Sequence, residues 1–184
     1  MGVKSCIPFL HCAFASLFSA VLGACSAPTN GTSLPGTPAG TFNVVGTLGT
    51  NTCGAGLGLS NPWDFQVQLS VDETVLYLAE TDGSSQMSGP ITGTSAVLTA
   101  TGTANADATE AGVGSCNLTL TATFNLDLNS ESSPTSFTGS VSYAYAVATG
   151  VASMAACNDQ LSSSGGDYAT LPCNFTYSLS GTHQ

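Results

Sequence analysis

Positive charge is almost absent from this sequence, because Lys4 is the only Lys or Arg among its 184 residues. Nucleic-acid binding needs cationic side chains that displace counterions from the phosphates, so the composition excludes nucleic acid as a partner. A P-loop and a Schiff-base mechanism each need a lysine, and both are therefore excluded beyond residue 4. All 11 Asp and Glu residues follow position 60, so a chain that loses its first residues keeps 11 carboxylates and no cationic side chain.

Histidine is also scarce, since the sequence holds only His11 and His183. A Ser-His-Asp or Cys-His catalytic group would have to use His183, which is the penultimate residue and is expected to fray. The patterns G-x-S-x-G and H-E-x-x-H do not occur. We therefore expect no enzyme activity, no catalytic residue and no cofactor.

Carboxylates are the remaining acid–base groups. Asp64, Asp127 and the Asp72-Glu73 pair are expected on polar strand faces or at strand ends, where a carboxylate is usually solvated. A hydrolase that uses two carboxylates stays open as an alternative, because such pairs meet only in the fold.

The first 24 residues have the organisation of a secretory signal peptide. Lys4 gives a short positive start, a mostly apolar stretch runs from Ile7 to Leu22, and no charged stop-transfer segment follows. The segment leads into Leu22-Gly23-Ala24-Cys25, which resembles the lipobox of bacterial lipoproteins: a branched apolar residue, two small residues and a cysteine. Ordinary signal cleavage is the alternative, but it prefers a small residue where Leu22 stands.

The resemblance to bacterial lipoproteins implies a lipid anchor. Cys25 would become the first residue of the mature protein and carry two or three acyl chains, palmitate among them, and each buried CH₂ contributes about 0.8 kcal/mol. Ser26 follows instead of the Asp that retains such proteins at the inner membrane, which favours the outer membrane. We expect the acyl chains to make the membrane contact, because basic residues that could bind anionic lipid are lacking.

Residues 25–40 are predicted to form a tether between the lipidated cysteine and the folded domain. Residues 26–40 contain three Pro and three Gly and show no apolar periodicity. A flexible coil of this length spans on the order of 20 Å. The rest of the chain, residues 41–184, is predicted to be a single β-rich domain.

Alternation of apolar and polar residues dominates this domain and predicts strands. Four segments alternate clearly: Trp63–Val71, Cys116–Leu128, Phe137–Val147 and Phe175–Leu179. Three weaker candidates are Phe42–Leu48, Thr74–Glu80 and Ile91–Thr101, and only Val151–Ser162 could form a short helix.

Turn residues separate the predicted strands, at Asn61-Pro62, Thr81-Gly83, Ser88-Pro90, Asn129–Pro134 and Gly165-Gly166. About seven or eight strands with mostly short connections favour an all-β fold, either an antiparallel sandwich or a small meander barrel.

Four cysteines remain after the signal peptide and Cys25 are set aside: Cys53, Cys116, Cys157 and Cys173. An even number in an exported domain predicts two disulfides, with three possible pairings. We favour Cys157–Cys173, which closes a short loop, and by elimination Cys53–Cys116. Zinc on four thiolates is the alternative, but no C-x₂-C spacing supports it.

Two further groups could bind a ligand. Trp63, Phe65, Tyr143, Tyr145 and Tyr177 could line a cavity in a barrel, or they could simply pack as its core. The segments Glu80–Ser84 and Asp107–Glu110 carry oxygen ligands suited to calcium, but they lack the EF-hand pattern and are also ordinary turn sequences. No metal site is therefore assigned from the sequence, and calcium stays open.

The combination of lipobox, Pro/Gly spacer and a Cys-stapled β domain whose last strand follows Leu171-Pro172-Cys173 resembles small envelope lipoproteins of Gram-negative bacteria. The resemblance implies no functional residue beyond Cys25. We expect a non-enzymatic structural or interaction module, with an unidentified protein partner or small apolar ligand. A lipocalin-like carrier of an apolar ligand is the first alternative, and a carboxylate-based hydrolase is the second.

Overall fold

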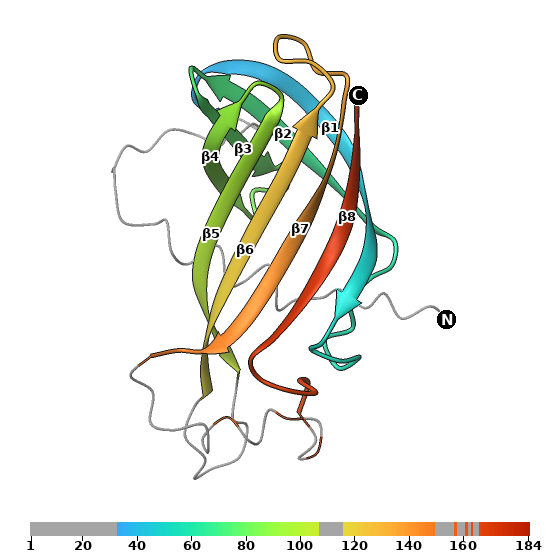
Figure 1. Cartoon of the computed structure of the whole chain (residues 1–184), viewed down its shortest axis with the longest axis vertical. Helices are drawn as coiled ribbons and strands as arrows, with labels where there is room; N and C mark the ends of the chain where they lie inside the picture. The colour runs from blue at the N-terminus through green and yellow to red at the C-terminus, as the bar shows by residue number, and fades with distance from the viewer. Residues whose placement is uncertain (1–32, 107–115, 150–156, 158–160, 162, 164–165) are drawn as a thin grey trace.

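The computed structural model describes residues 33–106, 116–149, 157, 161, 163 and 166–184. These residues form a closed, all-antiparallel barrel in which each strand pairs with its neighbours in sequence (Figure 1). The strands are β1 (Thr37–Asn51), β2 (Trp63–Asp72), β3 (Val75–Glu80), β4 (Gln86–Thr92), β5 (Ser95–Ala106), β6 (Cys116–Leu128), β7 (Ser136–Val147) and β8 (Cys173–His183). Within the described part of the chain, no helix is long and apolar enough to cross a membrane.

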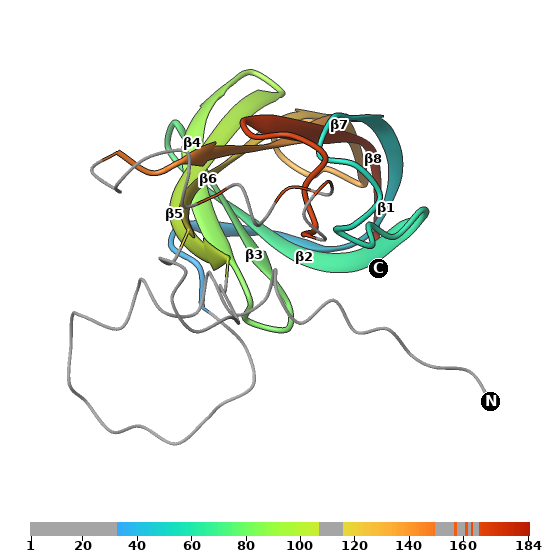
Figure 2. The same cartoon turned by 90° about the horizontal axis from the view of Figure 1, so that it is seen from below.

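Pairing between the first and last strands closes the barrel. The β1–β8 register runs from Phe42 opposite His183 to Asn51 opposite Phe175, and Figure 2 shows the resulting ring of strands. His183 lies in this ladder, and its backbone N–H donates to the carbonyl of Thr135 at 2.9 Å. The expectation that His183 frays is therefore wrong, because closure of the barrel gives the last strand a partner on both sides.

The clearly alternating segments were predicted well, and the weaker ones less so. Trp63–Val71 and Cys116–Leu128 match β2 and β6 closely. The predicted turn at Ser88–Pro90 instead lies inside β4, and the predicted strand Ile91–Thr101 is divided by a turn at Gly93, where φ is 59°. β1 begins at Thr37, so four residues assigned to the tether belong to the first strand. Most of the predicted helix Val151–Ser162 lies outside the described residues.

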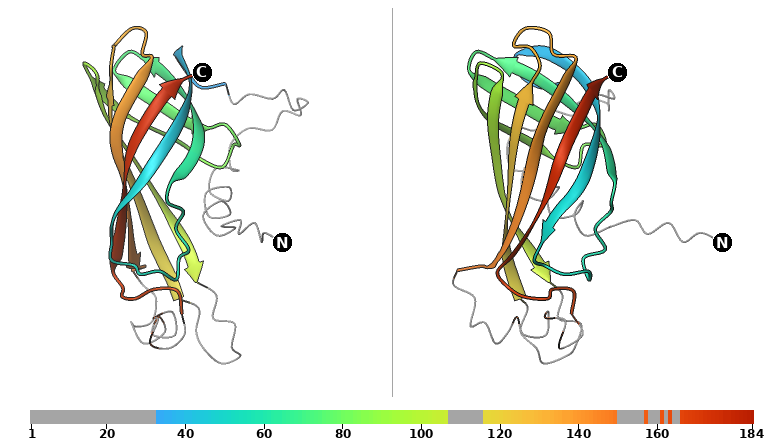
Figure 3. Two further views of the ribbon diagram at one scale, coloured as in Figure 1. Left: turned by 90° about the vertical axis from the view of Figure 1, so that its right-hand side faces the viewer. Right: turned by 45° about the vertical axis from the view of Figure 1, so that its right-hand side comes forward.

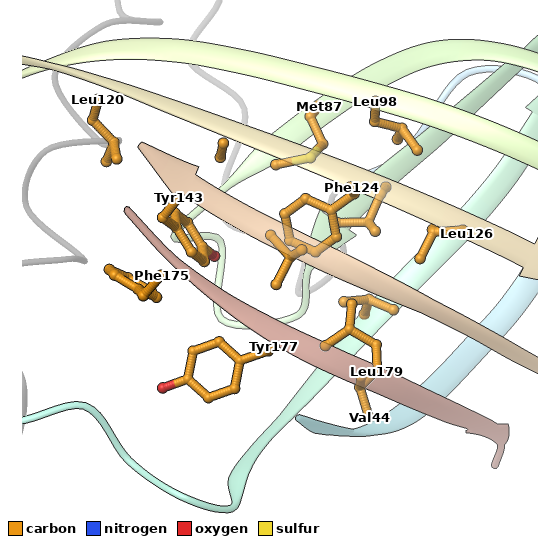
Figure 4. Packing of buried hydrophobic residues seen from close by; sticks show 14 of the residues in the cluster. Val44, Met87, Leu98, Leu120, Phe124, Leu126, Tyr143, Phe175, Tyr177 and Leu179 are labelled. Carbon is orange, nitrogen blue, oxygen red and sulfur yellow. The ribbon is translucent and has the colours of Figure 1, made fainter. Parts of the chain in front are cut away.

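Alternation along the strands separates an apolar inside from a polar outside. Inward side chains on β6 are at most 4% exposed, and Figure 4 shows Leu120, Phe124 and Leu126 packed against residues of the other strands. The outward positions form neutral rows across strands, for example Thr101, Thr121 and Ala144. Burial of apolar side chains on this scale, at about 25 cal/mol per Å², is the main source of stability in such a barrel.

Two glycines allow close approach inside the barrel. A Cβ at Gly181 would overlap the ring of Phe137, which lies in the opposite position on β7. A Cβ at Gly89 would overlap the carbonyl of Val97, so the absence of a side chain lets the backbone of β5 approach β4.

The two predicted disulfides are present, but their predicted pairing is wrong. Cys53 bonds to Cys173, and Cys116 bonds to Cys157. The prediction favoured the pairing that closes a short loop. Closure of the barrel instead places the end of β1 beside the start of β8, where the backbone N–H of Thr52 donates to the carbonyl of Asn174 at 2.8 Å. Both bonds lie at one end of the barrel, which we call the disulfide end; the opposite end contains Thr37, Leu128 and His183.

Candidate functional site

A connected set of aromatic rings occupies the inside of the barrel toward the disulfide end. Figure 4 shows three of them, Tyr143, Phe175 and Tyr177, pointing into the interior from β7 and β8. We call the whole set the aromatic cluster. Its members are Trp63, Phe65, Phe124, Tyr143, Tyr145, Tyr168, Phe175 and Tyr177.

The aromatic cluster contains all five rings that the sequence singled out as candidates for a ligand cavity. Trp63 lies at its edge: its ring stacks on Phe65 with centroids 4.0 Å apart, and it contacts Tyr177 at 5.2 Å and Tyr143 at 6.4 Å. Trp63 and Phe65 come from β2, whereas the three candidate tyrosines come from β7 and β8. The sequence therefore identified five of the eight members, because inward positions of different strands meet inside a closed barrel.

Most of the aromatic cluster is core and not an empty cavity. Tyr143, Tyr145 and Tyr177 are each 4% exposed, and Phe175 is 1% exposed. They fill the space between the strands.

Trp63 and Phe65 differ from the other members because both are partly exposed. Further along the same inward face of β2, Val67 and Leu69 are at most 1% exposed. The difference follows from the length of β3, which pairs with β2 only between Val67 and Asp72.

The hairpin of β3 and β4 is short and covers only the part of the barrel near the opposite end, as Figure 1 and Figure 3 show. The pairing of this hairpin with β5 is also short. The described pairs between β4 and β5 are Ile91 with Ala96 and Thr92 with Ser95. The inward side of β5 then carries the small residues Ala100 and Gly102, both partly exposed. Phe65 therefore lies beyond the end of the β3–β4 hairpin, which agrees with its partial exposure.

Glu80 lies where this hairpin turns. It is opposite Val67 in the β2–β3 ladder, and directly opposite residues place their side chains on the same face, so Glu80 faces inward. Its two carboxylate oxygens accept hydrogen bonds from the hydroxyls of Ser84 at 2.7 Å and Ser85 at 2.8 Å. Both donors are neutral, and the described residues contain no Lys or Arg that could pair with Glu80.

Burial raises the pKa of several tyrosines in the cluster. Desolvation is the largest cause for Tyr143, and the nearby charges include that of Glu80, so Glu80 acts on the same interior space. Burial also raises the pKa of Tyr145, and it raises the pKa of Tyr168 to about 12. The hydroxyl of Tyr177 donates to the carbonyl of Ser60 at 2.8 Å, which fixes this ring against the β1–β2 loop.

The carboxylates proposed for acid–base chemistry lie apart from one another. Asp64 is exposed on the outer face of β2, opposite Val45. Asp127 is exposed near the end of β6 and accepts a hydrogen bond from Ser95. Asp72 ends β2, and Glu73 lies in the tight turn that leads into β3. The structure therefore brings no two of these three locations together.

The candidate calcium segments do not assemble a metal centre in the described residues. No group of three or more His, Cys, Asp or Glu side chains gathers there. In the first segment, the carboxylate of Asp82 accepts from the N–H of Ser84 at 2.9 Å, as a turn residue does. The second segment, Asp107–Glu110, lies outside the described residues, as does the lipidation candidate Cys25.

Glu80 is the residue whose placement the sequence argument missed. The sequence placed it at the end of the predicted strand Thr74–Glu80 and in the calcium segment Glu80–Ser84, but not on an inward face. It follows Leu76 and Leu78 at the two-residue spacing of an inward strand face. This two-residue spacing was enough to predict that Glu80 faces inward. Charged side chains are rarely found at inward positions.

The comparisons with known proteins give no match: no family model, no curated protein and no solved structure matches this chain.

Proposed function

We propose that the protein is a lipid-anchored lipoprotein of the bacterial cell envelope, held at the outer membrane by acyl chains on Cys25, and that its barrel is a non-enzymatic interaction module. One observation on the described residues supports the second part: their side chains fill the barrel interior, and Asp64, Asp127 and the Asp72-Glu73 pair lie apart from one another. A filled, disulfide-bonded barrel is a rigid scaffold. The anchor rests on the sequence Leu22-Gly23-Ala24-Cys25.

The fold gives such an anchored barrel a preferred arrangement. The described chain enters beside the end of β2, where the carbonyl of Pro35 accepts a hydrogen bond from Ser70 at 2.6 Å. This entry lies at the end of the barrel that also contains His183. The tether from Cys25 would thus hold the end that contains Thr37 and His183 nearest the membrane. The disulfide end, with partly exposed Trp63 and Phe65, would then point away from the membrane.

Intact-mass analysis of the membrane-extracted protein, with and without reduction, tests the anchor. We expect a chain that begins at Cys25, carries the mass of two or three acyl chains and gains four protons on reduction, because two disulfides open. A Cys25→Ser variant is expected to lose the acyl mass and the membrane association together. A wild-type chain that begins elsewhere and carries no lipid would refute the anchor.

A lipocalin-like carrier is the second candidate, because the required small closed barrel is present. Partly exposed Trp63 and Phe65 give an apolar ligand one place of contact. Since Tyr143 and Phe175 are tightly packed, a ligand inside the barrel would have to displace them. Native mass spectrometry separates the candidates: a co-purifying molecule that is released on denaturation would favour the carrier over the filled scaffold.

A further inference from the structure

One edge of β5 lacks a strand partner over much of its length. On one side, β5 pairs with β6 without a break from Ser95 to Ala106. On the other side, the described pairs with β4 involve only Ser95 and Ala96. Figure 1 and Figure 3 show β5 running on past the β3–β4 hairpin toward the disulfide end. Among the described residues, no strand pairs with this side of β5 beyond Ala96, and we call it the open edge.

Pro90 explains why the pairing with β4 stops. The backbone N–H of Ile91 donates to the carbonyl of Thr74 at 2.9 Å, so the backbone polar groups of Ile91 point toward β3. Backbone groups alternate in direction along a strand, and those of Pro90 therefore point toward β5. A proline has no N–H to donate there, and the next pair of the ladder, Pro90 with Val97, is missing.

The backbone groups at the open edge belong to Thr99, Thr101 and Thr103. The carbonyl of Thr94 accepts from the backbone N–H of Leu128 at 2.9 Å, so even-numbered residues of β5 turn their backbone groups toward β6. Odd-numbered residues turn theirs toward the open edge. Each of these three threonines thus presents one N–H and one C=O there, and all three residues are exposed.

The sequence of β5 lacks the residues that usually protect a strand edge. Natural proteins guard free edges with charged side chains, with proline or with a bulge. The strand Ser95–Ala106 contains no charged residue and no proline, and its pairing with β6 has no bulge. An edge of this kind is suited to strand addition, in which an extended peptide pairs with the exposed backbone groups.

Nearby carboxylates favour a positively charged peptide. A strand that continues the line of β4 along β5 would begin beside the hairpin turn, at which Glu80 lies. Asp64 is exposed on β2, in the part of that strand that β3 does not pair with. The described residues contain no Lys or Arg, so a second copy of this chain would add only further negative charge. We infer that the open edge of β5 binds an extended, positively charged segment of a partner protein as an added strand.

This inference rests on the proposed interaction module and names the kind of partner that the module binds. It does not depend on the lipid anchor, and it needs no cavity in the barrel. The added strand would pair with the backbone of Thr99, Thr101 and Thr103, and its basic side chains would approach Glu80 and Asp64.

Amide hydrogen exchange measured by NMR tests the open edge before any ligand is added. The full-length protein is extracted in an uncharged sugar-headgroup detergent. We expect the N–H groups of Thr99, Thr101 and Thr103 to exchange faster than those of Leu98 and Ala100, which β6 already binds. Equal protection of the two sets would overturn the inference.

The binding probe is the acetylated and amidated peptide Lys-Thr-Val-Thr-Val-Thr-Lys. We expect saturable binding that slows exchange at Thr99, Thr101 and Thr103. One control peptide has Glu in place of both Lys, and the other carries N-methyl groups on every internal residue, which remove its backbone donors. Each is expected to bind about tenfold more weakly, the scale of one or two backbone hydrogen bonds or of a few weak charge contacts. Equal binding of the probe and either control would overturn the inference.

Variants of one residue assign the binding to β5. Thr101→Pro removes an N–H from the open edge and is expected to weaken probe binding about tenfold, whereas Thr101→Val keeps that N–H and should leave the affinity unchanged. Unchanged affinity in folded Thr101→Pro would overturn the inference. If Thr101→Pro does not fold, the N-methylated peptide decides alone.

The outcomes separate this inference from the proposed function. A lipidated chain that does not bind the probe would overturn the inference and leave the anchor standing, because intact mass tests the anchor independently. A lipid-free chain that binds the probe would support the inference and refute the anchor.

Discussion

Cys53 and Cys173 are separated by 120 residues in the sequence, yet their Cα atoms lie 4.9 Å apart at the junction of the first and last strands. The Cys116–Cys157 bond spans 41 residues at the same end of the barrel. A disulfide restricts the unfolded chain, and the restriction grows slowly with loop length. The bond between the terminal strands is therefore the more effective of the two in stabilising the closed barrel.

The first prediction compares the two bonds. In the chain-entropy model, Cys53→Ser with Cys173→Ser removes about 5 kcal/mol, and Cys116→Ser with Cys157→Ser removes about 4 kcal/mol. Urea unfolding of the two double variants against the wild type measures both losses. A non-reduced peptide map gives an independent check, and a peptide joining Cys53 to Cys116 would contradict the observed pairing.

The failure to predict this pairing shows where sequence reasoning stops. Alternation along Trp63–Val71 and Cys116–Leu128 is a local property, so those strands and their inward faces could be predicted. Closure of β1 on β8 is a long-range event that leaves no local signal, and both the disulfide pairing and the order at His183 depend on it. The candidate site was predicted in part. Its rings follow the alternation plainly, whereas the inward position of Glu80, the last residue of the weak strand candidate Thr74–Glu80, was not predicted.

The second prediction concerns the close contact between Gly181 and Phe137. Gly181→Ala is expected to destabilise the barrel by about 1–3 kcal/mol, because the new Cβ overlaps the ring and forces a core side chain to move. Combining it with Phe137→Leu removes the ring that causes the overlap. In a double-mutant cycle measured by urea unfolding, the double variant should therefore lose less stability than the sum of the single variants. Strict additivity would show that the ring is not the cause.

The third prediction concerns Ser70, which is 1% exposed and donates to the carbonyl of Pro35 at 2.6 Å. Ser70→Ala is expected to cost about 1 kcal/mol, since the hydrogen bond from the buried hydroxyl to the carbonyl of Pro35 is lost. Because this bond fastens the start of the described chain to β2, hydrogen exchange at Gly36 and Thr37 should also become faster. Ser178→Ala on the exposed face of β8 is the control and should change neither quantity.

The last prediction follows from the buried tyrosines. Burial raises the pKa of Tyr143 and Tyr145 far above the usual value of about 10, and raises that of Tyr168 to about 12. Above about pH 10 the unfolded chain loses these phenolic protons while the barrel keeps them, so the folded state binds more protons and stability falls as the pH rises. Below that pH both states are protonated, and these groups cause no pH dependence.

Each such tyrosine contributes a slope of about −1.4 kcal/mol per pH unit between its unfolded and folded pKa. Urea unfolding at a series of alkaline pH values should therefore show a plateau followed by a steep loss of stability. Tyr143→Phe removes one ionising group from the unfolded state and should make the loss shallower by one such slope, whatever its effect on stability at neutral pH. Near-ultraviolet absorbance should show Tyr143 ionising together with unfolding, and ionisation of all tyrosines near pH 10 in the folded protein would contradict the packed interior on which the filled scaffold rests.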